Sequence, residues 1–324
     1  DRTLLRMLGM RRTMFVVSHD VAAIMNGGCT RLLAPPQRRR FAKMLTDQEI
    51  TVDGAAWIED VEARTLAALE ERGEATAAEL RSDVPEFTAS LRFGEGKSWG
   101  GAVGVSTRVL FLLATEGKII RARPKGSWIS SQYRWAPTDA WLAEPLPEID
   151  RDVAQAELLR RWLAAFGPGT FTDLKWWTGW TVRDTRAAIS ALEAVEVELD
   201  DGTGWVLPDD VGPEEAAADW VALLPGLDPT VMGWKDRDWY FGKHAAQLFD
   251  RNGNAGPTVW WNGRVIGGWT QRKDDGEIVY RLLEPVPGGV AEAVDAEAAA
   301  LQEWMGDVVV TPRFPVPLDK EMRS

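Results

Sequence analysis

The sequence predicts an α+β protein in which tandem winged helix-turn-helix domains are followed by a small C-terminal domain of β-barrel-like type. The first observation is the order of patterns after residue 150. A helical pattern over 152–166 precedes a helix opened by Thr170 and Asp173, and a third helix with one apolar stripe spans 182–195. Two apolar runs around an Asp/Gly turn follow at 197–207 and indicate a hairpin. Three helices and a hairpin are typical of a winged helix.

The second observation is an internal repeat of this unit. Residues 73–80 match residues 167–174 without a gap, and Thr107–Arg108 with its apolar helix matches Thr185–Arg186. A Gly-rich insertion at 94–101 separates the two parts of the earlier copy. Residues 119–123, a turn at 124–126 and Trp128–Ile129 supply its predicted wing. A repeat indicates architecture more strongly than any single helix does.

Composition and charge limit the class of protein. The chain has 324 residues, 45% of them hydrophobic and 27% charged, which is typical of a folded soluble protein of two to three domains. We expect a cytoplasmic monomer, because no membrane-length apolar run or signal peptide is visible and a lone cysteine, Cys29, cannot form an intrachain disulfide. One Cys and two His argue against a structural zinc site, and no cofactor is expected.

Charge is distributed unevenly along the chain. The net charge is −12, but residues 1–43 carry nine Arg or Lys and two Asp, which gives +7 there and −19 in the remainder. A basic end on an acidic body suits a protein that contacts DNA along one surface.

The chain divides into four predicted parts. Residues 1–50 read as the back half of a first winged helix and a basic connector, with the end of a helix at Leu4–Leu8, a strand over Met10–Val17, and a Pro35–Pro36 break. Because Asp1 begins inside this pattern, we expect an N-terminally truncated chain. The second winged helix spans 51–145 and the third 150–208.

Residues 217–324 form the predicted β-rich domain, which we expect to be barrel-like or an open sheet. Asn262–Gly263 lies between two apolar runs and is a strong hairpin turn. A further strand at 277–283, an Ala/Glu-rich helix at 291–305 and a last strand at 308–311 follow.

Three stretches carry a resemblance to a known family. They are residues 10–17, the Leu-Pro-Gly-Leu-Asp-Pro and Gly-Trp-Lys-Asp-Arg-Asp-Trp motifs at 224–229 and 233–239, and residues 250–259. Together they resemble the bacterial winged-helix DNA-binding-domain family that contains the crosslink-repair DNA glycosylases of the AlkZ and YcaQ type. The resemblance implies tandem winged helices, a C-terminal β-barrel and double-stranded DNA, alkylated or crosslinked, as the partner.

The resemblance also bears on catalysis. It places a Gln–apolar–Gln/Asp motif before the Met-Arg segment, upstream of Asp1, and a His where this chain has Phe15. We therefore expect the catalytic residues to lie outside this sequence, and the chain alone not to excise bases. If it does, Asp20, His19 and Gln37 are the candidates. Such a glycosylase needs only a positioned water and stabilisation of the sugar oxocarbenium ion, because an alkylated purine is already a good leaving group.

Basic side chains in the connector, the second winged helix and the later motifs are the predicted DNA contacts. For Arg186 a solvated role is favoured because acidic residues surround it, and Trp176 and Trp177 are expected to be core at least in part. The predicted contacts are Arg11, Arg12, Arg38, Arg39, Arg40, Arg108, Arg121, Arg123, Lys125, Lys235, Arg237 and Arg251.

The preferred reading is a DNA-binding protein related to alkylation-repair glycosylases, with its own catalysis in doubt. The first alternative is an active monofunctional glycosylase of alkylated purines when the protein is full length. The second is a winged-helix scaffold for protein partners, which draws on the −19 charge of residues 44–324.

Overall fold

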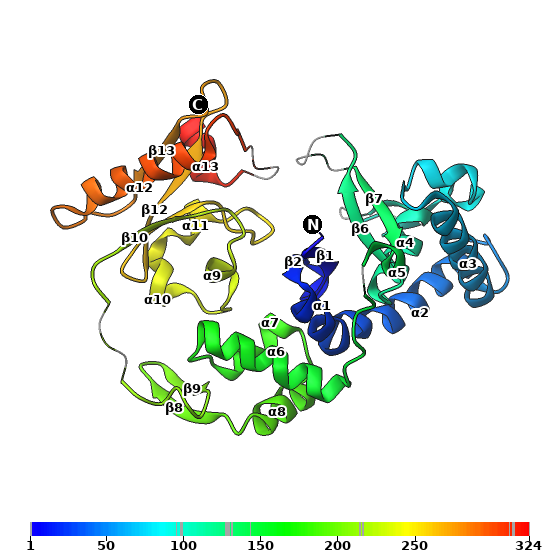
Figure 1. Ribbon diagram of the computed structural model, residues 1–324, viewed down its shortest axis with the longest axis horizontal. Coiled ribbons are helices and arrows are strands. Elements are labelled where there is room, and N and C mark those ends of the chain that lie inside the picture. Colours follow the sequence, from blue (N-terminus) through cyan, green and yellow to red (C-terminus); the bar gives the residue numbers. More distant parts are fainter. Residues whose placement is uncertain are drawn as a thin grey trace. The chain divides into compact units, whose positions relative to one another are not determined.

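The computed structural model contains a mixture of helices and strands arranged in two compact units (Figure 1). It describes residues 2–94, 96–97, 100–126, 130, 132–142, 144–213, 215, 217–310, 312 and 315–323. Unit 1 comprises Asp1–Ala164 with Thr178–Ala194, and unit 2 comprises Ala165–Trp177 with Val195–Ser324. None of the described helices combines the length and apolar character that a membrane span requires.

Unit 1 begins with a β-hairpin. Strands β1 (Leu4–Leu8) and β2 (Met14–Ser18) pair antiparallel, with Leu5 opposite Val17. The predicted helix end at Leu4–Leu8 is therefore wrong. Over so short a run the apolar spacing fits both the helical and the strand period, and pairing with β2 makes this segment a strand. Helix α1 (His19–Met25) follows.

Two long helices come next. A π-helical turn (η2, Asn26–Thr30) leads into α2 (Arg31–Asp47). Helix α3 (Gly54–Arg72) follows, and the Asp53 carboxylate caps its start by accepting hydrogen bonds from the Ala55 and Ala56 amides. The predicted break at Pro35–Pro36 is wrong, because both prolines lie inside α2. Burial of Phe41 and Leu45 in the core shared with α3 outweighs the missing proline N–H groups.

The rest of the second predicted winged helix is short elements around α4. These are β3 (Ala75–Thr76), η3 (Glu79–Ser82), η4 (Pro85–Thr88), β4 (Ser90–Phe93), β5 (Gly101–Gly104), α4 (Val105–Thr115), β6 (Ile119–Pro124), β7 (Tyr133–Pro137) and α5 (Thr138–Trp141). Strands β4 and β5 form a hairpin that flanks the Gly-rich insertion. The sheet order is β3-β7-β6, so β7 pairs with β6, and the predicted wing residues Trp128–Ile129 lie outside the described residues.

The helices and hairpin predicted after residue 150 are present. They are α6 (Arg151–Phe166), α7 (Phe171–Thr178), α8 (Val182–Ala191), β8 (Val195–Leu199) and β9 (Gly202–Val206). The boundaries between the two units run through this stretch. Most of α6 and all of α8 belong to unit 1, whereas most of α7 and both strands belong to unit 2.

The same capping box closes the start of both repeats. The Thr76 amide donates to Glu79 Oε2 (2.8 Å), and the Glu79 amide donates to Thr76 Oγ1 (3.2 Å). Thr170 and Asp173 make the same reciprocal pair at 3.2 and 3.1 Å. The residue before each Thr also pairs with a strand tryptophan, Ala75 with Trp135 of β7 and Gly169 with Trp205 of β9.

The later match between the repeats is out of phase. Thr185 is fully buried and bonds to the Thr181 carbonyl, whereas Thr107 is exposed. The buried stripes instead align Ser106 with Thr185 and Val109 with Ala188, one position from the sequence match. Arg108 and Arg186 therefore do not lie on equivalent faces.

Unit 2 is built around a four-stranded antiparallel meander in the order β10 (Val221–Leu224), β11 (Thr258–Trp261), β12 (Arg264–Gln271) and β13 (Ile278–Leu282). Asn262 and Gly263 form the predicted turn, both with positive φ. The short helices α9 (Pro229–Met232), α10 (Asp238–Phe241), η5 (Gly242–His244) and α11 (Ala245–Leu248) connect β10 to β11. Helices α12 (Val290–Met305) and α13 (Pro317–Arg323) follow the sheet.

Of the two expected forms the structure has the open sheet, and the barrel is wrong, because no described sheet closes on itself. Successive residues of β10 point into two different cores. Leu223 packs in a core shared with α12, and Leu224 packs against a core shared with α10 and α13. Helices therefore cover both faces of the sheet, and closure is not needed to bury them. Val308–Val310 is not a strand, although the Val310 amide donates to Gln271 Oε1.

The capping box at Thr76 should make the stability of the fold depend on pH through Glu79. Hydrogen bonds from the Thr76 amide, Lys125 and the Thr76 hydroxyl lower the pKa of Glu79 from 4.5 to about 2. The carboxylate thus stabilises the fold above pH 4.5, and this contribution disappears as the pH falls towards 2. We expect Glu79→Gln to lose less stability than the wild type over that range in chemical denaturation. The control is Glu59→Gln, at an exposed glutamate without an ion pair to described residues; equal losses in Glu79→Gln and the wild type would contradict the assignment.

Candidate nucleic-acid interface

Two arginines form the tip of the β1–β2 hairpin. Arg11 and Arg12 both have positive φ, 53° and 65°, in a turn closed by a 2.8 Å bond from the Gly9 amide to the Thr13 carbonyl. Each such residue costs about 1–3 kcal/mol, and strain of this kind concentrates at functional sites. The Arg11 side chain passes close to Gly179, and both arginines are exposed.

Arg12 belongs to a cluster of like charges. Burial lowers the pKa of the Arg108 guanidinium, and the positive charges of Arg40 and Arg12 lower it further. The three groups come from different elements, Arg12 from the hairpin tip, Arg40 from α2 and Arg108 from α4. We call them the arginine cluster.

The arginine cluster has no carboxylate partner within the described part of the chain. None of its three members makes an ion pair with a described residue, and Arg108 Nε is shielded from solvent without a hydrogen bond. Uncompensated guanidinium groups held together in this way are suited to binding an anion that carries several negative oxygens.

The neighbouring Arg38 has the opposite surroundings. It bonds to the Glu62 carboxylate of α3 at 2.8 Å and also to Glu116 after α4, which Lys118 contacts in turn. Glu62 is 4% exposed, so this ion pair fastens α2 to the core of unit 1. The structure therefore gives Arg38 a balancing partner that Arg39 and Arg40, both exposed, do not have among described residues.

The other predicted contacts in unit 1 fall into two kinds. Arg123 is exposed and makes no ion pair to a described residue, whereas Lys125 lies 3.0 Å from the capping-box Glu79. Arg121 is packed: its Cζ lies 4.5 Å from the centre of the Tyr133 ring and 5.3 Å from that of Trp135.

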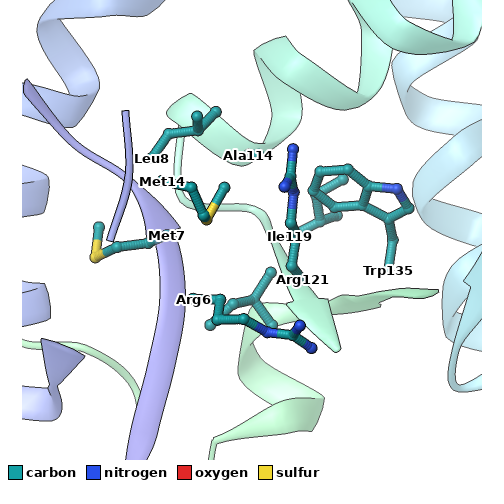
Figure 2. A pocket seen from close by; sticks show the side chains of 9 residues that line it. Arg6, Met7, Leu8, Met14, Ala114, Ile119, Arg121 and Trp135 are labelled. Carbon is teal, nitrogen blue, oxygen red and sulfur yellow. The ribbon is translucent and has the colours of Figure 1, made fainter. Parts of the chain in front are cut away.

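A small pocket lies beside Arg121. Arg6 and Met7 of β1, Met14 of β2, and residues of α4, β6 and β7 line it, and Figure 2 shows Arg121 alongside the Trp135 ring. Burial and then the Arg6 charge lower the pKa of Arg121, which Tyr133 partly offsets. Arg6 was not singled out from the sequence, because its partners in β6 and β7 are more than 110 positions away.

The predicted DNA contacts in unit 2 also differ in their exposure and packing. Lys235 and Arg251 are exposed and make no ion pair with described residues. Arg237 is half-buried, donates to the Trp234 carbonyl at 2.9 Å, and has its Cζ 5.1 Å from the centre of the Trp176 ring. Arg237 therefore packs within its unit.

Three groups carry candidate chemistry. A hydrogen bond from Ser18 and one from Arg161, 2.8 Å away, lower the pKa of Asp20 to about 2. His19 Nε2 lies 2.7 Å from the Arg2 carbonyl, and Gln37 Oε1 is shielded from solvent without a hydrogen bond. No group of three or more His, Cys, Asp or Glu among the described residues could hold a metal ion.

Comparison with known proteins places these features in context. The family model described as DNA glycosylase AlkZ-like matches residues 1–304. A solved structure, that of Streptomyces sahachiroi DNA glycosylase AlkZ, is similar with a TM-score of 0.67 at 19% identity, over 96% of this chain and 81% of that chain. No curated protein sequence matches significantly.

Arg38 and Arg39 are consecutive in α2, and their substitution tests whether the first stabilises the fold while the second is only a surface charge. We expect Arg38→Ala to lower the free energy of unfolding by about 1–3 kcal/mol, because it leaves the buried Glu62 carboxylate without its partner. Arg39→Ala removes the same charge one residue away, and we expect it to change stability by less than about 0.5 kcal/mol. Urea denaturation measures both, and similar effects of the two changes would show that the ion pair does not fasten α2.

Proposed function

The chain belongs to the AlkZ-like DNA glycosylase family, and from this premise we propose that it binds double-stranded DNA through the basic surface of unit 1. The arginine cluster is the observation that carries the proposal. Like charges repel, so Arg12, Arg40 and Arg108 are more stable with an anion between or beside them than alone. The phosphate backbone supplies such an anion at regular intervals.

The position of Arg108 on α4 and the repeated capping boxes support this proposal. Helix α4 occupies the place of the third helix of the predicted second winged helix, and Arg108 lies in its first half. The matching capping boxes and the strand pairs at Ala75 and Gly169 support tandem winged helices at 51–145 and 150–208. Arg39 and Arg123 add exposed charge without ion pairs to described residues, so we include them in the surface.

The salt dependence of binding tests this surface. We expect the double variant Arg12→Gln/Arg40→Gln to bind plain duplex more weakly and to lower the slope of log K against log salt by about 2, because each phosphate contact contributes about 0.9. The variant Arg272→Gln/Arg281→Gln removes the same charge from residues that pair with Glu277 and Glu321, and serves as control.

Two outcomes would count against the proposal. An unchanged slope in the first variant would place the DNA contacts elsewhere. Absence of duplex binding by the wild type would favour the alternative of a scaffold for protein partners, to which the −19 charge of residues 44–324 is suited.

A second candidate function is hydrolysis of the N-glycosidic bond of alkylated purines, which the family membership favours. Such a reaction needs a group that remains negatively charged beside the developing oxocarbenium ion. Asp20 meets this requirement, since its pKa of about 2 keeps the carboxylate ionised at neutral pH.

Release of free base from duplex containing N7-alkylguanine tests the second candidate. If Asp20 acts in this way, we expect wild-type release to fall by about 100-fold in Asp20→Asn. Arg161→Gln breaks the same ion pair but keeps the carboxylate, so it should retain most activity. Equal rates in Asp20→Asn and the wild type would exclude Asp20, and no release by the wild type would remove the candidate function for this chain.

A further inference from the structure

Trp239 is exposed in a way that its neighbours are not. It lies in α10 within the Gly-Trp-Lys-Asp-Arg-Asp-Trp motif and is 62% exposed, whereas the next two residues, Tyr240 and Phe241, are 1% and 0% exposed. Leaving an indole in water forgoes the free energy of burying it, so a large exposed aromatic ring at one point of a buried segment invites a functional explanation.

The indole ring of Trp239 is held in place by other aromatic rings. Its centre lies 5.2 Å from that of Trp234 and 4.7 Å from that of Tyr240, both in edge-to-face geometry. Tyr240 in turn stacks on Trp260 at 5.4 Å and donates its hydroxyl proton to the Val231 carbonyl. A ring with such support loses little conformational freedom when a ligand stacks on it.

The backbone before Trp239 is also anchored. The Asp173 carboxylate, which caps α7, accepts from the Lys235 and Asp236 amides at 2.8 and 3.3 Å. Arg237 packs over Trp176 and Phe249 and bonds to the Trp234 carbonyl. The motif thus ties α7 to α10 within unit 2 and leaves the Trp239 ring and the Lys235 side chain exposed to solvent.

We propose that Trp239 is the surface on which an unpaired nucleobase of bound DNA stacks. Every base has a π-face, so stacking on an aromatic ring is strong without depending on sequence. Exposed Asp236 and Asp238 balance Lys235 and Arg237, so this site adds little attraction for phosphate and selects unstacked bases instead. The proposal rests on the DNA binding proposed above.

The chain contains a matched control in Trp304. This residue is 83% exposed on α12, and no aromatic ring contact orders it among the described residues. Lacking such support, an exposed tryptophan there should contribute nothing to base stacking.

The experiment compares binding of the whole chain to two DNA probes, a plain duplex and the same duplex with a single-base bulge. We expect the wild type to prefer the bulge, and Trp239→Leu to lose about 5- to 100-fold in affinity for it with unchanged affinity for plain duplex. Trp239→Phe keeps an aromatic face and should retain most of the preference. Trp304→Leu should behave as the wild type, and thermal denaturation checks that each variant is folded.

The outcomes separate this inference from the function on which it rests. Plain-duplex binding with no bulge preference, or a preference that Trp239→Leu retains, would overturn the role of Trp239 and leave the arginine cluster intact. Equal weakening on both probes would show that Trp239 serves the fold or a paired contact. Failure of the wild type to bind either DNA would overturn both proposals.

Discussion

The ion pairs of Arg38 with Glu62 and Glu116 join the three helices α2, α3 and α4, two of which carry arginines of the basic surface. Arg38 lies on α2, Glu62 on α3 and Glu116 directly after α4. Arg40 lies two residues from this neutralised anchor, and its positive charge lowers the pKa of Arg108 on α4, so the two side chains repel. Balanced charge inside the unit therefore permits unbalanced charge at its surface, which is what a phosphate-binding surface requires.

Local chemistry was predictable from the sequence. The Thr-x-x-acid capping boxes and the Asn262–Gly263 turn need only residues a few positions apart, and both are present. The Leu4–Leu8 strand and the helix through Pro35 were missed, and the choice between a barrel and an open sheet stayed open, because pairing and packing with distant elements decide them. Likewise, the pairing of Arg38 with Glu116 spans 78 positions, so three consecutive arginines could not be told apart in the sequence.

Asp173 shows how a local motif can acquire a tertiary role. As a cap it satisfies the Thr170 amide, and the same carboxylate also receives two amides from the segment that ends in Trp239. The motif at 233–239, one of those that carry the family resemblance, is thereby held by hydrogen bonds to the second repeat through Asp173. Membership of the AlkZ-like DNA glycosylase family gives both features a common context, in which one unit offers unbalanced charge and the other an ordered aromatic surface.

If duplex DNA binds as proposed, its phosphates occupy the arginine cluster. Modification of arginines by phenylglyoxal, followed by mass spectrometry with and without plain duplex, measures this residue by residue. We expect duplex to protect Arg12 and Arg40 while Arg272 and Arg281 react equally in both samples. Unchanged reactivity of Arg12 and Arg40 in the DNA-bound protein would contradict it.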